Sequence, residues 1–315
     1  MTNDGATEAA IRIGQKNADE VLAWRKGVRE RRAAAIAAHP KPIRLNVEAM
    51  DFAGASLGTT SQETSGFLLA VGDSWFDYPR HDVLKLLDEY GYNVESAAHK
   101  GDRMESIAYQ TNQLDEFASG LDKIIGQGGL PKAILISGGG DDIAGSEFGM
   151  LLNSAASQIS GWNTEIVDGV VNQRILTAYK ATLAAINRLC KQRAGQTFPI
   201  LVHGYDYPVP DGRGFLGGWP FPGPWLEPGF HEKQFGDLQT NVELMRVVID
   251  RFNAMLEGLV SDPAFPGVHY VNLRGKLSTE LANDAYQEWW ANELHPTEDG
   301  FRKVASEFAF VLSGL

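Results

Sequence analysis

The stretch Phe67-Leu68-Leu69-Ala70-Val71-Gly72-Asp73-Ser74-Trp75-Phe76-Asp77 decides the fold. It begins with a short apolar run bounded by Gly66, which predicts a buried β-strand. The run ends in a small polar turn that presents Ser74. Ligands bind beyond the carboxyl ends of strands in an open α/β sheet, so Ser74 is a candidate nucleophile. A serine needs a base and an oxyanion site, which other parts of the chain must supply.

Four further segments predict strands, and helical patterns separate them. The strand candidates are residues 92–98, 133–137, 198–204 and 268–273. Helical periodicity covers residues 82–90, 104–125, 170–193, 241–260 and 301–312. Strands that alternate with helices are typical of a parallel sheet with helices on both faces. We therefore predict an α/β fold, a flavodoxin-like three-layer doubly wound sheet of about five parallel strands, with an extra N-terminal helical segment.

The N-terminal segment lies outside this alternation. Residues 6–38 are rich in Ala, Glu, Arg and Lys, which favour a helix, and the sequence His-Pro-Lys-Pro at residues 39–42 ends it. We divide the chain into a helical extension and linker, residues 1–60, and an α/β domain, residues 61–315. The basic run at residues 24–32 indicates either an anionic partner or a solvated helix. The prediction is the helix, packed on the body of the protein or on a second subunit of a homo-oligomer.

Composition and charge exclude several classes of protein. The chain has 315 residues, 43% of them hydrophobic and 22% charged, as in a globular protein with a full core. Its formal net charge of −12 argues against nucleic acid as a partner. The lone Cys190 excludes an internal disulfide and a Cys-based zinc site. No apolar run can span a bilayer or form a signal-peptide core, so we expect a cytoplasmic protein, although a chain whose signal had been removed would look the same.

Polar turns follow three of the predicted strands, and a fourth polar cluster precedes the last helix. Besides Ser74 they contain Gly101-Asp102, Gly139-Gly140-Asp141-Asp142 and Asn292-Glu293-Leu294-His295. Because parallel strands end at one edge of a sheet, we expect these turns to meet there. His295 would then act as general base for Ser74, and the backbone N–H groups of Ser74 and Gly101 would face a developing oxyanion.

These four blocks, in this order, resemble the SGNH (GDSL-type) hydrolases, esterases and lipases with a flavodoxin-like sheet. Gly72-Asp73-Ser74-Trp75 stands where the family has Gly-Asp-Ser-Leu, and Gly101 matches the glycine of the second block. The resemblance extends from about residue 67 to the C-terminus. It implies that Ser74 is the nucleophile, that His295 is the base, and that Gly101 and residue 141 complete the oxyanion hole. It implies neither a cofactor nor a metal.

Asp141 departs from the family pattern, which has asparagine at this position. An amide donates a hydrogen bond to an oxyanion, whereas an ionised carboxylate cannot. The loss of one oxyanion donor typically costs about 10²–10³ in rate. Three readings stay open: Asp141 is protonated in a site shared with Asp142, it turns away and leaves backbone donors to serve, or the position has been altered to an impaired form.

Asn292 is the second departure, because the family has an aspartate that orients the histidine. The amide oxygen of Asn292 can accept a hydrogen bond from His295 but offers no charge to an imidazolium. A backbone carbonyl could orient His295 instead, in a Ser-His dyad, or Glu293 or another acid could substitute in space. The sequence does not choose among these arrangements.

The leading hypothesis is a serine esterase that forms an acyl-enzyme on Ser74 and hydrolyses a small-molecule or polymeric ester, either a carboxylic ester or an O-acetyl group. A loop at residues 206–230, rich in Gly, Pro and aromatic residues, forms a wall or lid of the site or else only covers an exposed core edge. The candidate substrate-binding residues are Trp75, Asp142, Trp219 and Trp225. The two departures motivate an alternative, a non-catalytic ligand-binding protein on the same scaffold. A metal-dependent hydrolase that uses Asp73, Asp141, Asp142 and a histidine is a third reading, although these residues lack a regular ligand spacing.

Overall fold

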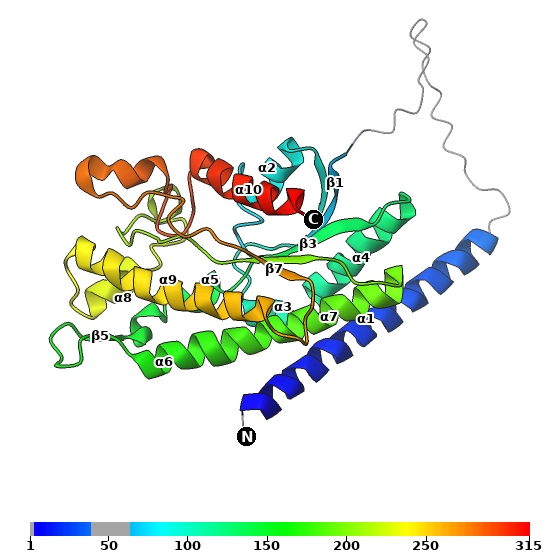
Figure 1. Ribbon diagram of the computed structural model, residues 1–315, viewed down its shortest axis with the longest axis horizontal. Coiled ribbons are helices and arrows are strands. Elements are labelled where there is room, and N and C mark those ends of the chain that lie inside the picture. Colours follow the sequence, from blue (N-terminus) through cyan, green and yellow to red (C-terminus); the bar gives the residue numbers. More distant parts are fainter. Residues whose placement is uncertain (1–2, 39–63) are drawn as a thin grey trace, which may run out of the picture.

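A five-stranded parallel sheet lies at the centre of the computed structural model, which describes residues 3–38 and 64–315 (Figure 1). The strand order is β2-β1-β3-β6-β7. This order confirms the predicted flavodoxin-like, doubly wound sheet. A separate antiparallel pair, β4 and β5, lies outside the main sheet. The strands are β1 (Gly66–Val71), β2 (Tyr92–Ser96), β3 (Pro131–Ile136), β4 (Leu152–Asn153), β5 (Gly161–Trp162), β6 (Ile200–His203) and β7 (Val268–Val271).

Helices cover both faces of the sheet. α2 and α10 pack against each other on one face, while α4, α7 and α9 lie on the other (Figure 1). None of the helices within residues 3–38 and 64–315 is long and apolar enough to cross a membrane. The α-helices are α1 (Asn3–Ala38), α2 (Val83–Glu89), α3 (Met104–Tyr109), α4 (Asn112–Gly126), α5 (Gly140–Ile143), α6 (Thr164–Asp168), α7 (Leu176–Ala194), α8 (Glu227–Glu232), α9 (Leu238–Val260) and α10 (Glu298–Ser313). A π-helix (Gly169–Ile175) joins α6 to α7, and 3₁₀ turns span Phe148–Leu151, Phe215–Gly217 and Ala282–Glu288.

The central strands are apolar without alternation because helices bury them on both sides. Residues 68–71 of β1 and 133–136 of β3 are fully buried, and β6 is buried along its whole length. Continuous apolar runs of this kind are typical of parallel strands between two helical layers. The carboxyl ends of these strands therefore emerge at one edge of a rigid core, where the polar turns begin.

The region predicted as one helix, residues 104–125, forms two helices instead. α3 ends before Gln110, whose backbone is extended, with φ −103° and ψ 160°. The break sets Gln113 beside the turn after β1, where its side chain accepts the backbone N–H of Gly72 and donates to its carbonyl oxygen, both at 3.0 Å. A tertiary contact of this kind overrides helical periodicity, which reports only local preference.

The N-terminal helix α1 lies along α7 (Figure 1). Its contact face includes Gly14, where a Cβ would lie only 2.1 Å from the carbonyl oxygen of Ala181. Asp19 forms an ion pair with Arg188 of α7 at 2.9 Å. Of the two predicted packing modes, the structure shows the one on the body, and a homo-oligomer through this helix stays a prediction. The predicted helix stop at residues 39–42 and the boundary after residue 60 lie outside the described residues.

Candidate active site

Ser74 lies on the turn after β1, and His295 reaches it from the segment that precedes α10. The distance from Ser74 Oγ to His295 Nε2 is 2.7 Å. The His295 side chain is buried, and its ring stacks on Tyr78 with 4.3 Å between ring centroids. Burial lowers the pKa of His295 to about 3. The imidazole is therefore neutral at physiological pH, which is the form that can take a proton from a serine hydroxyl.

Asn292 holds the other nitrogen of the histidine ring. Its Oδ1 lies 3.0 Å from His295 Nδ1 and also accepts the backbone N–H groups of Leu294 and His295, at 3.0 and 2.9 Å. Its Nδ2 donates to the Tyr78 hydroxyl at 3.1 Å. These four contacts orient the amide with its oxygen toward His295. The proton accordingly resides on Nδ1, and Nε2 is left to accept from Ser74.

Glu293, a candidate acid for the histidine, is engaged elsewhere. Its buried carboxylate accepts the backbone N–H groups of Gly212, Trp225, Leu226 and Glu227, at 2.6–3.0 Å. Burial raises the pKa of Glu293, although these N–H groups oppose the rise. The carboxylate thus fastens both ends of the loop between residues 212 and 227 to the segment that carries His295.

Asp73 and Tyr205 connect the turn that bears Ser74 to the glycine turn after β3. One Asp73 oxygen accepts the Trp75 N–H at 3.0 Å and the Ser137 hydroxyl at 2.6 Å. The other oxygen accepts the Tyr205 hydroxyl, which itself accepts the Gly140 N–H at 3.2 Å. Tyr205 therefore ties the turn that bears Ser74 to the turn that bears Asp141.

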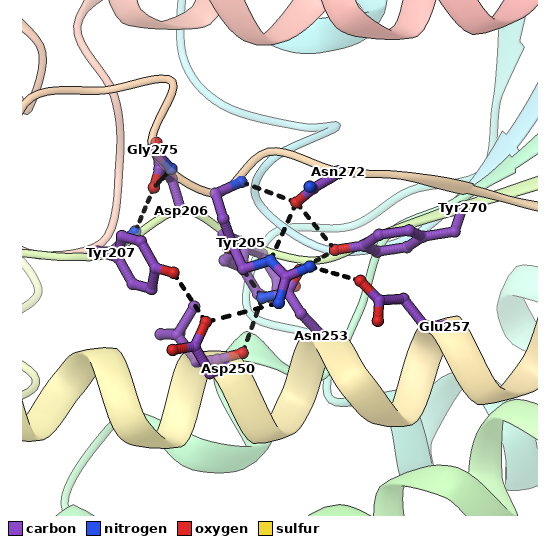
Figure 2. A network of polar contacts seen from close by, with 11 residues as sticks. Tyr205, Asp206, Tyr207, Asp250, Asn253, Glu257, Tyr270, Asn272 and Gly275 are labelled. Carbon is purple, nitrogen blue, oxygen red and sulfur yellow. Dashed lines mark hydrogen bonds and ion pairs between the residues drawn. The ribbon is translucent and has the colours of Figure 1, made fainter.

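A polar network behind Tyr205 joins the segments at the ends of β6 and β7 to the interior of α9, as Figure 2 shows. Asn253 of α9 donates to the carbonyl oxygen of Tyr205 at 3.3 Å and accepts the Tyr270 hydroxyl. Asp206 accepts backbone N–H groups on both sides, including that of Gly275 at 2.7 Å. Because its carbonyl group is held in this way, Tyr205 is well placed to support the turn that bears Ser74 and the turn that bears Asp141.

Asp141 and Asp142 share the glycine turn but point to different places. Gly139 opens this turn with φ 102°, and a Cβ there would lie 2.5 Å from the Phe252 ring, so only glycine fits. Asp142 accepts the backbone N–H of Met104 at 2.6 Å and so anchors α3. The Asp141 carboxyl makes no hydrogen bond within the described part of the chain. Burial, together with the nearby charges of Asp73 and Asp142, raises the pKa of Asp141 to about 7.

A cleft of about 430 Å³, here named the aromatic cleft, opens in front of Ser74. Gly101 contributes to its wall, and the left-handed backbone of this residue, φ 84°, turns the chain at that point. The lining consists of Ser74, Tyr78, Pro79, Lys100, Gly101, Asp141, Phe215, Phe221, Pro222, Trp225, Leu294 and His295. The cleft therefore combines the candidate catalytic groups with four aromatic side chains, Tyr78, Phe215, Phe221 and Trp225.

A second cavity of about 50 Å³, here named the inner chamber, lies beside the cleft. The two cavities share Ser74, Asp141 and Leu294. The rest of the chamber wall is mainly apolar and comes from Trp75, Ile143, Ala144, Pro208, Leu226, Met245, Ile249 and Trp290, with Asp73, Gly140, Tyr205 and Asp206.

The structure gathers most of the predicted site residues at this edge of the sheet. Ser74, Gly101, Asp141, His295 and Trp225 line the cleft, Trp75 lines the chamber, and Asn292 lies behind His295. Asp142 is turned to α3. Trp219 is 95% exposed and is not among the described residues that line either cavity. Three contributors were not singled out from the sequence: Tyr205, Phe215 and Phe221. The aromatic crowding of residues 206–230 signalled the last two only as a group.

The described residues include no group of three or more His, Cys, Asp or Glu side chains arranged to hold a metal ion. Asp73, the first carboxylate of the metal reading, already accepts hydrogen bonds from Trp75, Ser137 and Tyr205. Its oxygens are thus occupied by donors from the protein itself.

No family model and no curated protein matches the chain. Similar solved structures include a GDSL-like lipase from Bacteroides thetaiotaomicron, with 10% identity, a TM-score of 0.39 and coverage of 81% of this chain and 93% of that one. An acetylxylan esterase from Geobacillus stearothermophilus, solved as a catalytic mutant, has 13% identity, a TM-score of 0.39 and coverage of 79% and 94%. An α/β-hydrolase enzyme from the metagenome of Lake Arreo, Spain, has 15% identity, a TM-score of 0.42 and coverage of 79% and 96%.

One of these descriptions, that of the GDSL-like lipase, names the type of hydrolase that the sequence motifs resemble.

Proposed function

We propose that this protein is a serine ester hydrolase that works through an acyl-enzyme on Ser74. The observation that carries the proposal is the hydrogen-bonded line from Ser74 through His295 to Asn292, with contacts of 2.7 and 3.0 Å. A serine hydroxyl is a weak nucleophile until an adjacent base takes its proton. A neutral imidazole whose far nitrogen is held by an amide oxygen meets that requirement.

The reaction would begin when Ser74 Oγ attacks the ester carbonyl carbon and His295 Nε2 takes the hydroxyl proton. Candidate donors for the resulting oxyanion are the backbone N–H groups of Ser74 and Gly101, joined by the Asp141 carboxyl when it is protonated. His295 would then give its proton to the departing alcohol. A water molecule, deprotonated in turn by His295, would attack the acyl carbon. The bond from that carbon to Ser74 Oγ would then break as His295 returns the proton to Oγ, which releases the acid and regenerates the serine.

Labelling with a fluorophosphonate probe, alongside hydrolysis of p-nitrophenyl acetate, tests this proposal. We expect the wild type to be labelled and active, and Ser74→Ala to lose both properties. His295→Ala should slow the reaction by about 10²–10⁴, the usual contribution of a general base. Ser306→Ala, on the exposed side of α10, is the matched control and should be labelled like the wild type. A folded wild type without labelling or hydrolysis would instead support a non-catalytic binding protein.

A further inference from the structure

Two cavities of very different size meet at Ser74. The aromatic cleft of about 430 Å³ contains His295, whereas the described lining of the inner chamber, about 50 Å³, does not include it. An ester has two arms, the acyl chain and the alcohol, and both leave from the carbonyl carbon that Ser74 attacks. Each cavity can therefore take one arm.

The position of His295 decides which arm goes where. A general acid must lie within hydrogen-bond reach of the leaving oxygen, so the alcohol occupies the cavity that His295 lines. The acyl chain is left with the inner chamber, which reaches Ser74 and Asp141 but not the base. We propose that the inner chamber is an acyl pocket and that the protein, if it is the serine esterase proposed above, selects acetyl and propionyl esters of bulky, ring-containing alcohols.

The size of the chamber sets the acyl limit. A cavity of about 150 Å³ holds benzene, which has six non-hydrogen atoms, so one of about 50 Å³ holds roughly two. An acetyl group places one carbon beyond its carbonyl, and a propionyl group places two. Met245 and Ile249 of α9 form part of the wall and are both buried, so a longer chain would displace packed side chains.

The aromatic cleft suits a ring on the alcohol side. Tyr78, Phe215, Phe221 and Trp225 line it, and Phe215 meets Tyr78 edge to face with 5.7 Å between ring centroids. Flat aromatic faces bind rings, either aryl groups or the apolar faces of sugars. Lys100, the one cation in the described lining, would add a hydrogen bond to an oxygen substituent on such a ring.

The test measures kcat/KM for p-nitrophenyl acetate, propionate, butyrate and hexanoate. We expect a fall of about 10–200-fold between propionate and butyrate, the discrimination typical of one excess methylene. Met245→Ala enlarges the chamber and should move the optimum to butyrate. Ala144→Val reduces the volume of the chamber at an extended backbone position, φ −83° and ψ 155°. It should lower kcat/KM for the propionate ester and leave kcat/KM for the acetate ester close to the wild-type value.

Phe221→Ala is the matched control on the cleft side, where this side chain is 45% exposed. It should raise KM for ring-containing alcohols and leave the acyl-length profile as in the wild type. Acetate esters of phenol, of a pentose and of ethanol separate aryl from sugar preference, and equal rates on all three would contradict the assignment of the cleft to the alcohol.

Circular dichroism checks that each variant folds. If Met245→Ala does not fold, Ala144→Val alone tests the assignment of the inner chamber to the acyl chain. Equal rates on acetate and hexanoate, or a profile unmoved in both folded chamber variants, would overturn the acyl assignment alone. Failure to turn over any ester, with Ser74 unlabelled by fluorophosphonate, would overturn the proposed function itself.

Discussion

Replacement of Asp141 by asparagine tests the electrostatics of the oxyanion position. Burial and the charges of Asp73 and Asp142 raise the pKa of Asp141 to about 7. Below that pH the carboxyl carries a proton and can donate to an oxyanion, whereas above it the carboxylate only accepts and adds negative charge. Asparagine donates at every pH. The kcat/KM values of the variant and the wild type should therefore differ only at pH values where Asp141 is ionised.

The magnitude follows from the fraction that stays protonated. At about pH 8.5 a carboxyl with a pKa of about 7 is protonated in roughly one molecule in 30. Loss of an oxyanion donor costs about 10²–10³, so the ionised enzyme contributes little and kcat/KM should fall about thirtyfold from its plateau. Asp141→Asn should keep the plateau, which makes it about thirtyfold faster at that pH and equal to the wild type near pH 5.5.

The assay is kcat/KM for p-nitrophenyl acetate between about pH 4.5 and 9, corrected for spontaneous hydrolysis. His295 has its pKa lowered to about 3, so it stays neutral throughout and the alkaline limb belongs to Asp141. Asp142→Asn is the matched control: it removes one of the charges that raise the pKa of Asp141, so the limb should move to lower pH without disappearing. A wild type that shows no fall between pH 6 and 8.5, or an Asp141→Asn variant that falls equally, would refute the reasoning.

The raised pKa of Asp141 also makes the stability of the folded protein depend on pH. The pKa of Asp141 is raised from 3.8 to about 7 in the folded protein, so the native state binds this proton more tightly than the unfolded chain does. The resulting stabilisation is complete below about pH 4 and is lost as the pH rises through 7. Thermal melts should show the wild type losing stability relative to Asp141→Asn across that window, and parallel curves would contradict the raised pKa.

Three further substitutions probe the supports of the site. Asn292→Asp adds a negative charge behind His295. In serine proteases the change between Asp and Asn at the equivalent position alters kcat by about 10⁴, largely through the wrong tautomer. Here the amide already sets the tautomer, so we expect a gain in kcat of only about tenfold, and no gain would indicate that charge at this position does not limit the rate. Glu293→Gln weakens the acceptor of four backbone N–H groups, so urea unfolding should show a loss of about 1.5–3 kcal/mol together with a higher KM. An unchanged midpoint would show that the loop does not depend on this carboxylate. Tyr205→Phe leaves the Gly140 N–H without its acceptor, and kcat should fall about tenfold, or ~1.4 kcal/mol, at constant KM. A change confined to KM would contradict a role in positioning the turns.

Much of this arrangement follows from the sequence because topology alone brings the turns together. Residues 68–71 of β1 and 133–136 of β3 are continuous apolar runs, as expected for strands buried on both faces, and the turns after them carry Ser74 and Asp141. Once the sheet is parallel, their carboxyl ends share an edge. The contact between Ser74 and His295 joins residues 221 positions apart, yet the order of the four motifs suffices to anticipate it.

The sequence does not predict contacts between a side chain and backbone groups that are distant in the chain, because these contacts depend on the complete tertiary structure. Glu293, two residues before His295, reads from its position as a candidate acid, but its carboxylate is turned to four N–H groups of a loop about 70 residues earlier. Gln113 looks like an ordinary helix residue, and only the placement of Gly72 explains why the helix breaks before it. Tyr205 follows β6 without any motif, because its partners lie on two other turns.

The segment between Trp290 and Pro296, whose ends form a β-bridge, joins binding to chemistry. Asn292 orients the base, Glu293 fastens the loop that forms the cleft wall, and the carbonyl of Leu294 accepts the Trp75 indole N–H at 3.0 Å. These contacts share one short stretch of backbone, so we expect a displacement of the cleft wall to move His295 and the turn that bears Ser74 as well. Changes in the cleft wall that Glu293 fastens should accordingly alter kcat together with KM, whereas changes at Met245 and Ile249, which line the inner chamber from α9 and not from this segment, should act through the fit of the acyl group.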